Sequence, residues 1–149
     1  MFIGDFNCKI DSKKRVVFPS VFRKQMDGSM QEKFILKKDR FEPMLVLYHI
    51  EEWKRQVEKI KEKIDPLIPE HNKLFRGFYY GAAELLLDGS GRLLFPKRLL
   101  EQVGITKNIV MAGRDMTIEI WDEQKYYDNE MSNDEYLELV DSVLRDKKE

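Results

Sequence analysis

Hydrophobic and polar residues alternate at the start of the chain. The even positions carry apolar or small residues, namely Phe2, Gly4, Phe6, Cys8 and Ile10. This period of two is typical of a strand with one buried face. A short polar stretch over 11–14 and a β-prone stretch over 15–18 follow. The pattern therefore predicts a β-hairpin at the beginning of the chain.

The stretch from Asp11 to Pro19 returns later in the chain. Its sequence, Asp-Ser-Lys-Lys-Arg-Val-Val-Phe-Pro, is matched by Asp-Gly-Ser-Gly-Arg-Leu-Leu-Phe-Pro from Asp88 to Pro96. Both copies keep the acid, an arginine four residues later, two aliphatic residues, Phe and Pro. Downstream, Leu-Val-Leu-Tyr at 45–48 is echoed by Ile-Glu-Ile-Trp at 118–121. The chain is therefore a duplicated unit.

The remaining periodicity predicts the same elements in both copies. Short helices begin at the two prolines, because first-turn amides have no partner inside a helix. We expect helices over 19–26 and 96–103, strands over 33–36, 44–48, 108–112 and 116–121, and an amphipathic helix over 50–64. The spacing of Ser132 and Glu135 fits a capping box at the start of a further helix. We divide the chain into a first unit at 1–64, a linker at 65–77, a second unit at 78–131 and an acidic amphipathic helix at 132–149.

Charge is unevenly distributed along the chain. With 42% hydrophobic residues in 149 the chain is too apolar for disorder, and its net charge is only −1. Residues 1–24 nevertheless carry six Lys/Arg against two Asp/Glu, and 73–114 carry seven against three. Residues 115–149 carry four against twelve. Each repeated stretch therefore lies in a basic segment, whereas the tail is acidic.

Several classes of protein are disfavoured by the sequence. No apolar run approaches the roughly 20 residues of a spanning helix, and no signal pattern begins the chain, so we expect a cytoplasmic protein without a membrane partner. Cys8 is the single cysteine, which excludes an internal disulfide. His49 and His71 lack neighbours at metal-ligand spacing, and no nucleophile or Gly-rich phosphate loop is recognisable. We therefore expect no enzyme, metal, cofactor or small-molecule substrate.

Several motifs together resemble a known family. They are Met-Phe-Ile-Gly at the start, the two Asp-x-x-x-Arg motifs, Glu51-Glu52-Trp53 after a strand, and Ile120-Trp121-Asp122. This combination resembles MraZ, a family of bacterial transcriptional regulators with two AbrB-like units. The resemblance implies an α+β, β-rich tandem duplication of swapped-hairpin units with short helices that pack as an intrachain pseudo-dimer.

The resemblance also implies a function. Chains of this family assemble into rings and bind repeated sites in double-stranded DNA near the genes for division and the cell wall, mainly as repressors. The protein is therefore expected in the nucleoid, without a cofactor. The family's DNA-facing hairpin residues correspond here to Lys13, Lys14, Arg15 and Arg92.

The repeated motif also has a structural interpretation. Asp11 and Asp88 are expected to hold their turns by accepting backbone hydrogen bonds or by pairing with the following arginine. Lys14 stands where the family commonly has a turn glycine, which predicts an unfavourable backbone conformation. Ser90 replaces a basic residue. The second hairpin therefore offers fewer charges to phosphate.

An alternative interpretation is a protein-interaction or assembly module that keeps this fold and binds little DNA. It is favoured by the near-neutral total charge, by Ser90 and by the acidic tail. On this interpretation the apolar stripe of the tail docks against a neighbouring subunit or another protein. Its residues are Tyr136, Leu139, Val140 and Val143.

Overall fold

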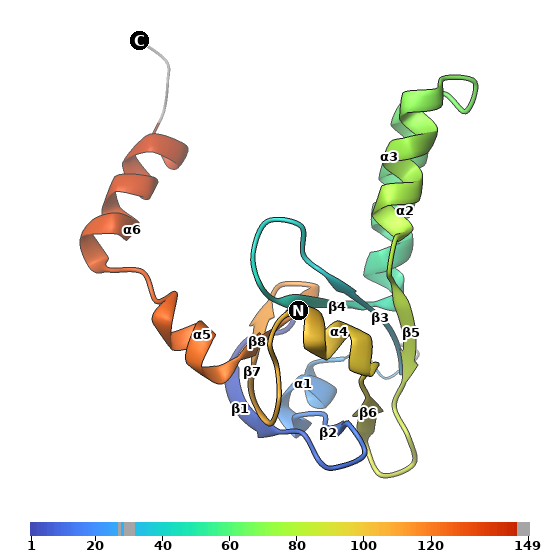
Figure 1. The fold of residues 1–149 in the computed structure, drawn as a ribbon. Coiled ribbons are helices and arrows are strands. Elements are labelled where there is room, and N and C mark those ends of the chain that lie inside the picture. The colour runs from blue at the N-terminus through green and yellow to red at the C-terminus, as the bar shows by residue number, and fades with distance from the viewer. Residues whose placement is uncertain (27, 29–31, 146–149) are drawn as a thin grey trace.

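The computed structural model describes residues 1–26, 28 and 32–145, which form antiparallel strands with helices packed around them (Figure 1). The first half contains β1 (Asp5–Lys9), β2 (Arg15–Val17), α1 (Ser20–Gln25), β3 (Lys33–Lys38), β4 (Leu45–His49) and α2 (Ile50–Lys63). Helix α3 (Pro69–Tyr79) leads to the second half, with β5 (Ala83–Leu86), β6 (Arg92–Leu94), α4 (Lys97–Gln102), β7 (Asn108–Arg114), β8 (Thr117–Asp122) and α5 (Glu123–Asp128). The tail consists of α6 (Asn133–Leu139) and a π-helix, η1 (Val140–Leu144).

Strands of the two halves are interleaved. The main sheet has six strands in the order β1-β7-β8-β4-β3-β5, so each hairpin's first strand pairs with the opposite half. The second strands, β2 and β6, pair only with each other and form a separate antiparallel ribbon. This arrangement confirms the predicted α+β fold of tandem swapped-hairpin units packed as an intrachain pseudo-dimer.

Two hydrophobic cores lie on opposite faces of the main sheet. Strand β4 is buried on both faces, with Leu45 and Leu47 in one core and Val46 and Tyr48 in the other. The first core is rich in phenylalanine and includes Phe18, Phe22 and Phe95 together with side chains from the β2–β6 ribbon. The second contains Trp53 and Trp121. Phe18, Phe95, Trp53 and Trp121 are all buried in these cores.

Helix α3 occupies most of the segment that the sequence analysis assigned to a linker. Pro69 stands in its first turn, where a missing amide costs nothing, so this proline starts the helix rather than preventing it. Phe78 stacks on Trp53 of α2 with ring centroids 4.7 Å apart and an interplanar angle of 18°. Aromatic packing of this kind favours the ordered α2–α3 hairpin.

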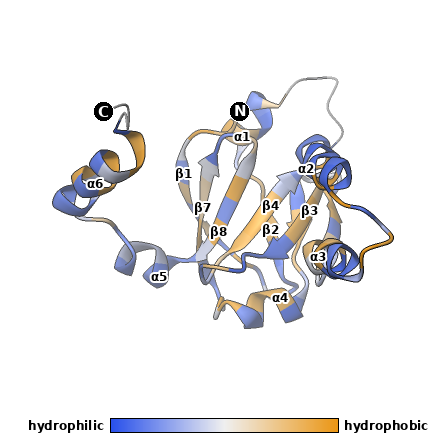
Figure 2. Ribbon diagram, turned by 90° about the horizontal axis from the view of Figure 1, so that it is seen from above, coloured by the Kyte–Doolittle hydropathy of each residue, from blue (hydrophilic) through white to orange (hydrophobic). Residues whose placement is uncertain are grey.

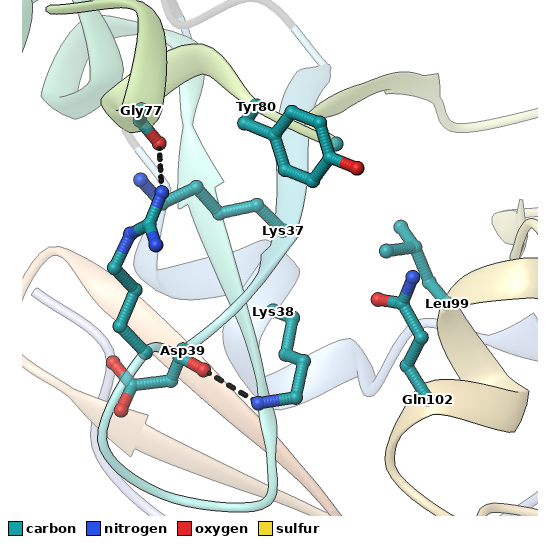
Figure 3. A pocket seen from close by; sticks show the side chains of 9 residues that line it. Lys37, Lys38, Asp39, Gly77, Tyr80, Leu99 and Gln102 are labelled. Carbon is teal, nitrogen blue, oxygen red and sulfur yellow. Dashed lines mark hydrogen bonds between the residues drawn. The ribbon is translucent and has the colours of Figure 1, made fainter. Parts of the chain in front are cut away.

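Lys37 of β3 links the α2–α3 hairpin to the main sheet. Its Nζ donates a hydrogen bond to the Phe78 carbonyl oxygen at 2.7 Å and lies 3.8 Å from the centre of the Phe78 ring. Desolvation by burial, helped by the nearby Arg40 charge and opposed by Asp39, lowers the pKa of Lys37 to about 8. The adjoining hollow has a volume of about 300 Å³. Arg40, which lines it, donates from Nη2 to the Gly77 carbonyl oxygen at 2.8 Å. Figure 3 shows the side chains around this hollow.

Lys37→Met is expected to change how stability depends on pH. The folded pKa of about 8 lies below the ordinary value of 10.5, so the unfolded chain holds more protons between these values. Protonated Lys37 therefore costs stability below pH 8, and the cost is relieved as pH rises. Between pH 8 and 9.5 the free energy of unfolding should rise by about 1–2 kcal/mol more in the parent than in Lys37→Met. Urea denaturation checks this, and a pH-independent difference between the two proteins would contradict it.

The tail helix begins as its sequence predicts. Ser132 Oγ accepts a hydrogen bond from the Glu135 amide at 3.1 Å, which caps α6. Beyond this cap the apolar side chains of the tail are largely exposed, including Leu139 at 44% and Val143 at 68%. Figures 1 and 2 show α6 standing away from the sheet, on the opposite side from the α2–α3 hairpin. The last predicted helical residues, 146–149, lie outside the described part of the chain.

Within the described residues, every helix is too short or too polar to span a membrane.

Candidate nucleic-acid interface

The two repeated turns flank one two-stranded ribbon. In the β2–β6 pairing Arg15 lies opposite Leu94, and Arg92 lies opposite Val17. The Phe18 amide donates to the Gly91 carbonyl oxygen at 2.9 Å. In the symmetric contact the Phe95 amide donates to the carbonyl oxygen of Lys14 at 2.8 Å. Each turn is therefore tied to the strand that follows the other turn, and the two form one surface (Figure 1).

The same hydrogen bonds hold both turns. Asp11 Oδ1 accepts from the amides of Lys13 and Arg15, both at 2.9 Å, and Asp11 Oδ2 accepts from Arg15 Nε at 2.9 Å. Asp88 Oδ1 accepts from the amides of Ser90 at 2.8 Å and Arg92 at 2.9 Å, and Oδ2 accepts from Arg92 Nε at 3.0 Å. The duplication thus preserves the turn geometry atom by atom.

These contacts stabilise the charged form of both aspartates. The pKa of Asp11 is lowered chiefly by the hydrogen bond from the Arg15 amide, and that of Asp88 chiefly by the bond from the Arg92 amide. A lowered folded pKa means that the contact contributes fully above the ordinary value of 3.8 and is lost only as pH falls through the folded value. Both aspartates are therefore ionised at neutral pH, and their hydrogen bonds hold the two turns in this conformation.

Each arginine uses only part of its guanidinium in the turn. Nε binds the aspartate, and no described residue forms a hydrogen bond or ion pair with Nη1 or Nη2 of Arg15 or Arg92. The side chains remain partly exposed, at 29% for Arg15 and 31% for Arg92. The outer edge of each guanidinium can therefore bind two acceptor atoms at once, as a guanine base or a phosphate presents them.

Two apolar side chains share the outer face of the ribbon with the arginines. Val17 is 63% exposed and Leu94 is 59% exposed, whereas Val16 and Leu93 point into the core. Strand geometry places Arg15 and Arg92 diagonally across the ribbon, with Cα atoms about 7–8 Å apart. The outer face of the ribbon thus presents two arginine side chains, each held by an aspartate, together with two exposed apolar side chains.

Lys14 has the strained backbone that its sequence predicts. Its φ is 66°, and Gly91 has φ 73° at the equivalent place in the second turn. Glycine adopts this left-handed region readily, but a residue with a Cβ is disfavoured there. Compared with the second hairpin, which has Gly91 at this place, the first hairpin gains the charge of Lys14 and loses some local stability.

A pair of substitutions at Lys14 separates backbone strain from charge. Lys14→Gly and Lys14→Ala remove the same charge, but only glycine relieves the positive φ. The glycine variant should have a free energy of unfolding about 1 kcal/mol higher than the alanine variant. Urea denaturation measures this difference, and equal stability would show that φ at this position carries no strain. We expect the two variants to bind DNA equally.

The predicted basic residues lie at both ends of the ribbon. Lys13, Lys14 and Arg15 occupy one end, and Arg92 the other, where the exposed Ser90 provides no charge. Figure 1 shows that the acidic tail projects from the opposite side of the molecule, so its charge does not lie beside the ribbon. DNA contact by these four residues stays a prediction.

Sequence analysis did not identify Val17 and Leu94 as parts of this surface. The sequence carried a signal for these positions. Val16 and Leu93 are the apolar middle residues of β2 and β6, and the residues on either side of them must face the opposite way. Arg23 of α1, a further basic residue of the first segment, pairs with Glu32 at 2.6 Å.

Comparisons with known proteins point to one family. A family model described as "MraZ protein, putative antitoxin-like" matches residues 1–66 and 78–139. A protein of Phocaeicola vulgatus named "Transcriptional regulator MraZ" is 39% identical over 83% of this chain and 80% of its own length. Proteins with the same name from Flavobacterium psychrophilum and Clostridium tetani are 38% identical over 83% and 78%, and 36% identical over 96% and 96%.

Proposed function

Because this chain belongs to the MraZ family, we propose that it is a transcriptional regulator that binds double-stranded DNA through the β2–β6 ribbon. The observation that carries the proposal is the pair of identically built Asp–Arg turns flanking a single exposed ribbon. The relatives carry the name of a regulator, not of an enzyme. Regulation by DNA binding is accordingly the function that this surface supports best.

The geometry of the ribbon suits the major groove. The groove admits a two-stranded β-ribbon, and an arginine there can donate to O6 and N7 of the same guanine. Asp11 and Asp88 fix the direction of the two guanidinium groups before DNA arrives, which lowers the entropic cost of binding. Arg15 and Arg92 are therefore the residues to which we assign recognition of bases.

The other members of the surface have distinct roles in the proposal. Lys13 and Lys14 neutralise phosphates and make affinity depend on salt. Val17 and Leu94 can contact thymine methyl groups, since apolar side chains serve this purpose in the major groove. Ser90 and Gly91 add no charge, so the first hairpin contributes more to affinity than the second.

The resemblance to the family supports finer proposals about regulation. We propose that the protein acts as a repressor at repeated sites near the genes for division and cell-wall synthesis, in the cytoplasm and associated with the nucleoid. We also propose that copies self-associate into a ring. One ribbon makes few contacts, and a ring that presents several ribbons to repeated sites would raise the overall affinity by multivalency.

A salt-dependent binding experiment tests the proposed function. Fluorescence anisotropy should compare DNA from upstream of the protein's own gene with a scrambled duplex, each at about 50 and 200 mM salt. We expect tighter binding to the native fragment and weaker binding at the higher salt. Equal and feeble binding to both duplexes would contradict the proposal and favour the assembly module with little DNA binding.

A further inference from the structure

The tail helix has an apolar face that its own chain leaves uncovered. Tyr136 is 56% exposed, Leu139 44% and Val143 68%. The polar side of the helix is acidic, with Asp134, Glu135, Glu138 and Asp141 against a single Arg145. Over α6 and η1 the helix is about 18 Å long at 1.5 Å per residue. A partner surface must therefore be an apolar groove of similar length with basic borders.

The α2–α3 hairpin carries such a groove. One hollow of about 630 Å³ and a second of about 650 Å³ adjoin, because both are lined by Ile60 and Leu74. The first continues to Ile64, and the second to Phe41 and Phe78. Helix α3 is about 17 Å long, which matches the tail. Leu74 is 62% exposed in the middle of this groove.

The borders of the groove are predominantly basic. Lys59, Lys63 and Lys73 line it and form no ion pair with any described residue. Glu62 and Glu70 are also present, and Lys37, Arg40 and Asp39 lie at its far end. Because Lys37 is buried, four exposed cations face three acids, which leaves a small excess of positive charge. The acidic side of the tail therefore complements the groove, which favours correct pairing.

The tail lies apart from the groove of its own chain in this structure. Helix α5 is fixed beside β1, because Tyr126 Oη donates to Asp5 Oδ2 at 2.9 Å and Tyr127 Oη donates to Asn7 Oδ1 at 3.2 Å. Figures 1 and 2 both place α6 and the α2–α3 hairpin at opposite ends of the molecule.

We propose that the α6–η1 helix of one copy docks lengthwise into the α2–α3 groove of a second copy. The inference rests on the proposed self-association and names the surfaces that produce it. The tail and the groove are different surfaces, so the contact is heterologous and propagates from chain to chain until a ring closes. It also leaves the β2–β6 ribbon uncovered, because both docking surfaces project from the other side of the molecule (Figure 1).

Matched substitutions test each side of this contact. Leu74→Glu places a negative charge in the groove, whereas Leu67→Glu does the same at an 88% exposed position of the α2–α3 connection outside it. Leu139→Ser with Val143→Ser removes apolar contacts of the tail. Sedimentation velocity should show that Leu74→Glu and the tail double variant each raise the dissociation constant for self-association at least tenfold, and that Leu67→Glu does not. Thermal unfolding confirms that each variant remains folded.

A mixing experiment shows which copy supplies the tail. The Leu74→Glu chain has an intact tail, and the Leu139→Ser/Val143→Ser chain has an intact groove. Each variant alone should be monomeric, and an equimolar mixture should form a one-to-one dimer. Monomers that fail to form this mixed dimer would overturn the proposal. Variants that keep the parent's assembly would overturn the tail contact while leaving self-association standing, and a monomeric parent would overturn both. DNA affinity of the monomeric variants reports separately on the ribbon.

Discussion

Replacing both Arg15 and Arg92 with alanine is expected to lower affinity for the native DNA fragment by at least about 30-fold, because each bidentate arginine–guanine contact is worth about 1–3 kcal/mol. The turns themselves should persist. Asp11 and Asp88 still accept backbone amides after the arginine side chains are removed. Anisotropy titration measures the loss, with circular dichroism and thermal unfolding as checks on the fold.

Substitution by lysine provides the matched control. Arg15→Lys with Arg92→Lys keeps both positive charges but loses the planar guanidinium that can bind two base atoms. This variant should retain most of the salt dependence and bind the native and scrambled fragments more equally. If the alanine variant binds as tightly as the parent, with an unchanged salt slope, the ribbon is not the interface.

Replacing Phe22 with alanine is expected to lower the free energy of unfolding by about 3–5 kcal/mol, the usual range for a buried phenylalanine. Phe22 is fully buried, and its ring makes edge contacts with Phe6 at 4.9 Å and Phe2 at 5.6 Å between centroids. Phe22→Leu fills most of the space and should lose about 1–2 kcal/mol. Chemical denaturation gives both values.

The same substitution tests whether the two units fold together. Phe22 and Trp53 belong to the first unit, whereas Trp121 belongs to the second, and β1 and β5 each pair with the opposite half. We propose that the units at 1–64 and 78–131 unfold as one body. In proteins that keep only Trp53 or only Trp121, Phe22→Ala should shift both fluorescence transitions equally. A shift confined to the Trp53 transition would show that the units are independent.

Much of this architecture could be predicted from the chain because its local signals agree. Alternating apolar residues located the strands, and the two prolines located α1 and α4. Periodicity does not specify which strand pairs with which, since Val16 and Leu93 would be equally buried in a simple hairpin. The swapped hairpins were expected only from the resemblance to the family, and the pairing of β2 with β6 comes from the structure. The outward positions of Val17 and Leu94 follow from strand alternation alone.

The α2–α3 hairpin shows where local signals mislead. Two prolines near its connection suggested a linker, but Pro69 stands at a helix start, where it is favoured. Lys37 is followed in the sequence by the half-buried residues Lys38 and Asp39, and it becomes buried because α3 brings Phe78 over it. Long-range packing of this kind leaves no signature near the lysine itself. The groove on this hairpin was for the same reason outside the reach of sequence analysis.

Methylation interference on the native fragment tests whether the β2–β6 ribbon recognises guanines in the major groove. Dimethyl sulfate methylates guanine N7 in the major groove and adenine N3 in the minor groove. We predict that methylation of particular guanines prevents binding by the parent, and that this interference disappears at separate guanines in Arg15→Ala and Arg92→Ala. Interference at adenines alone, or a guanine pattern that neither substitution changes, would show that Arg15 and Arg92 do not recognise guanines in the major groove.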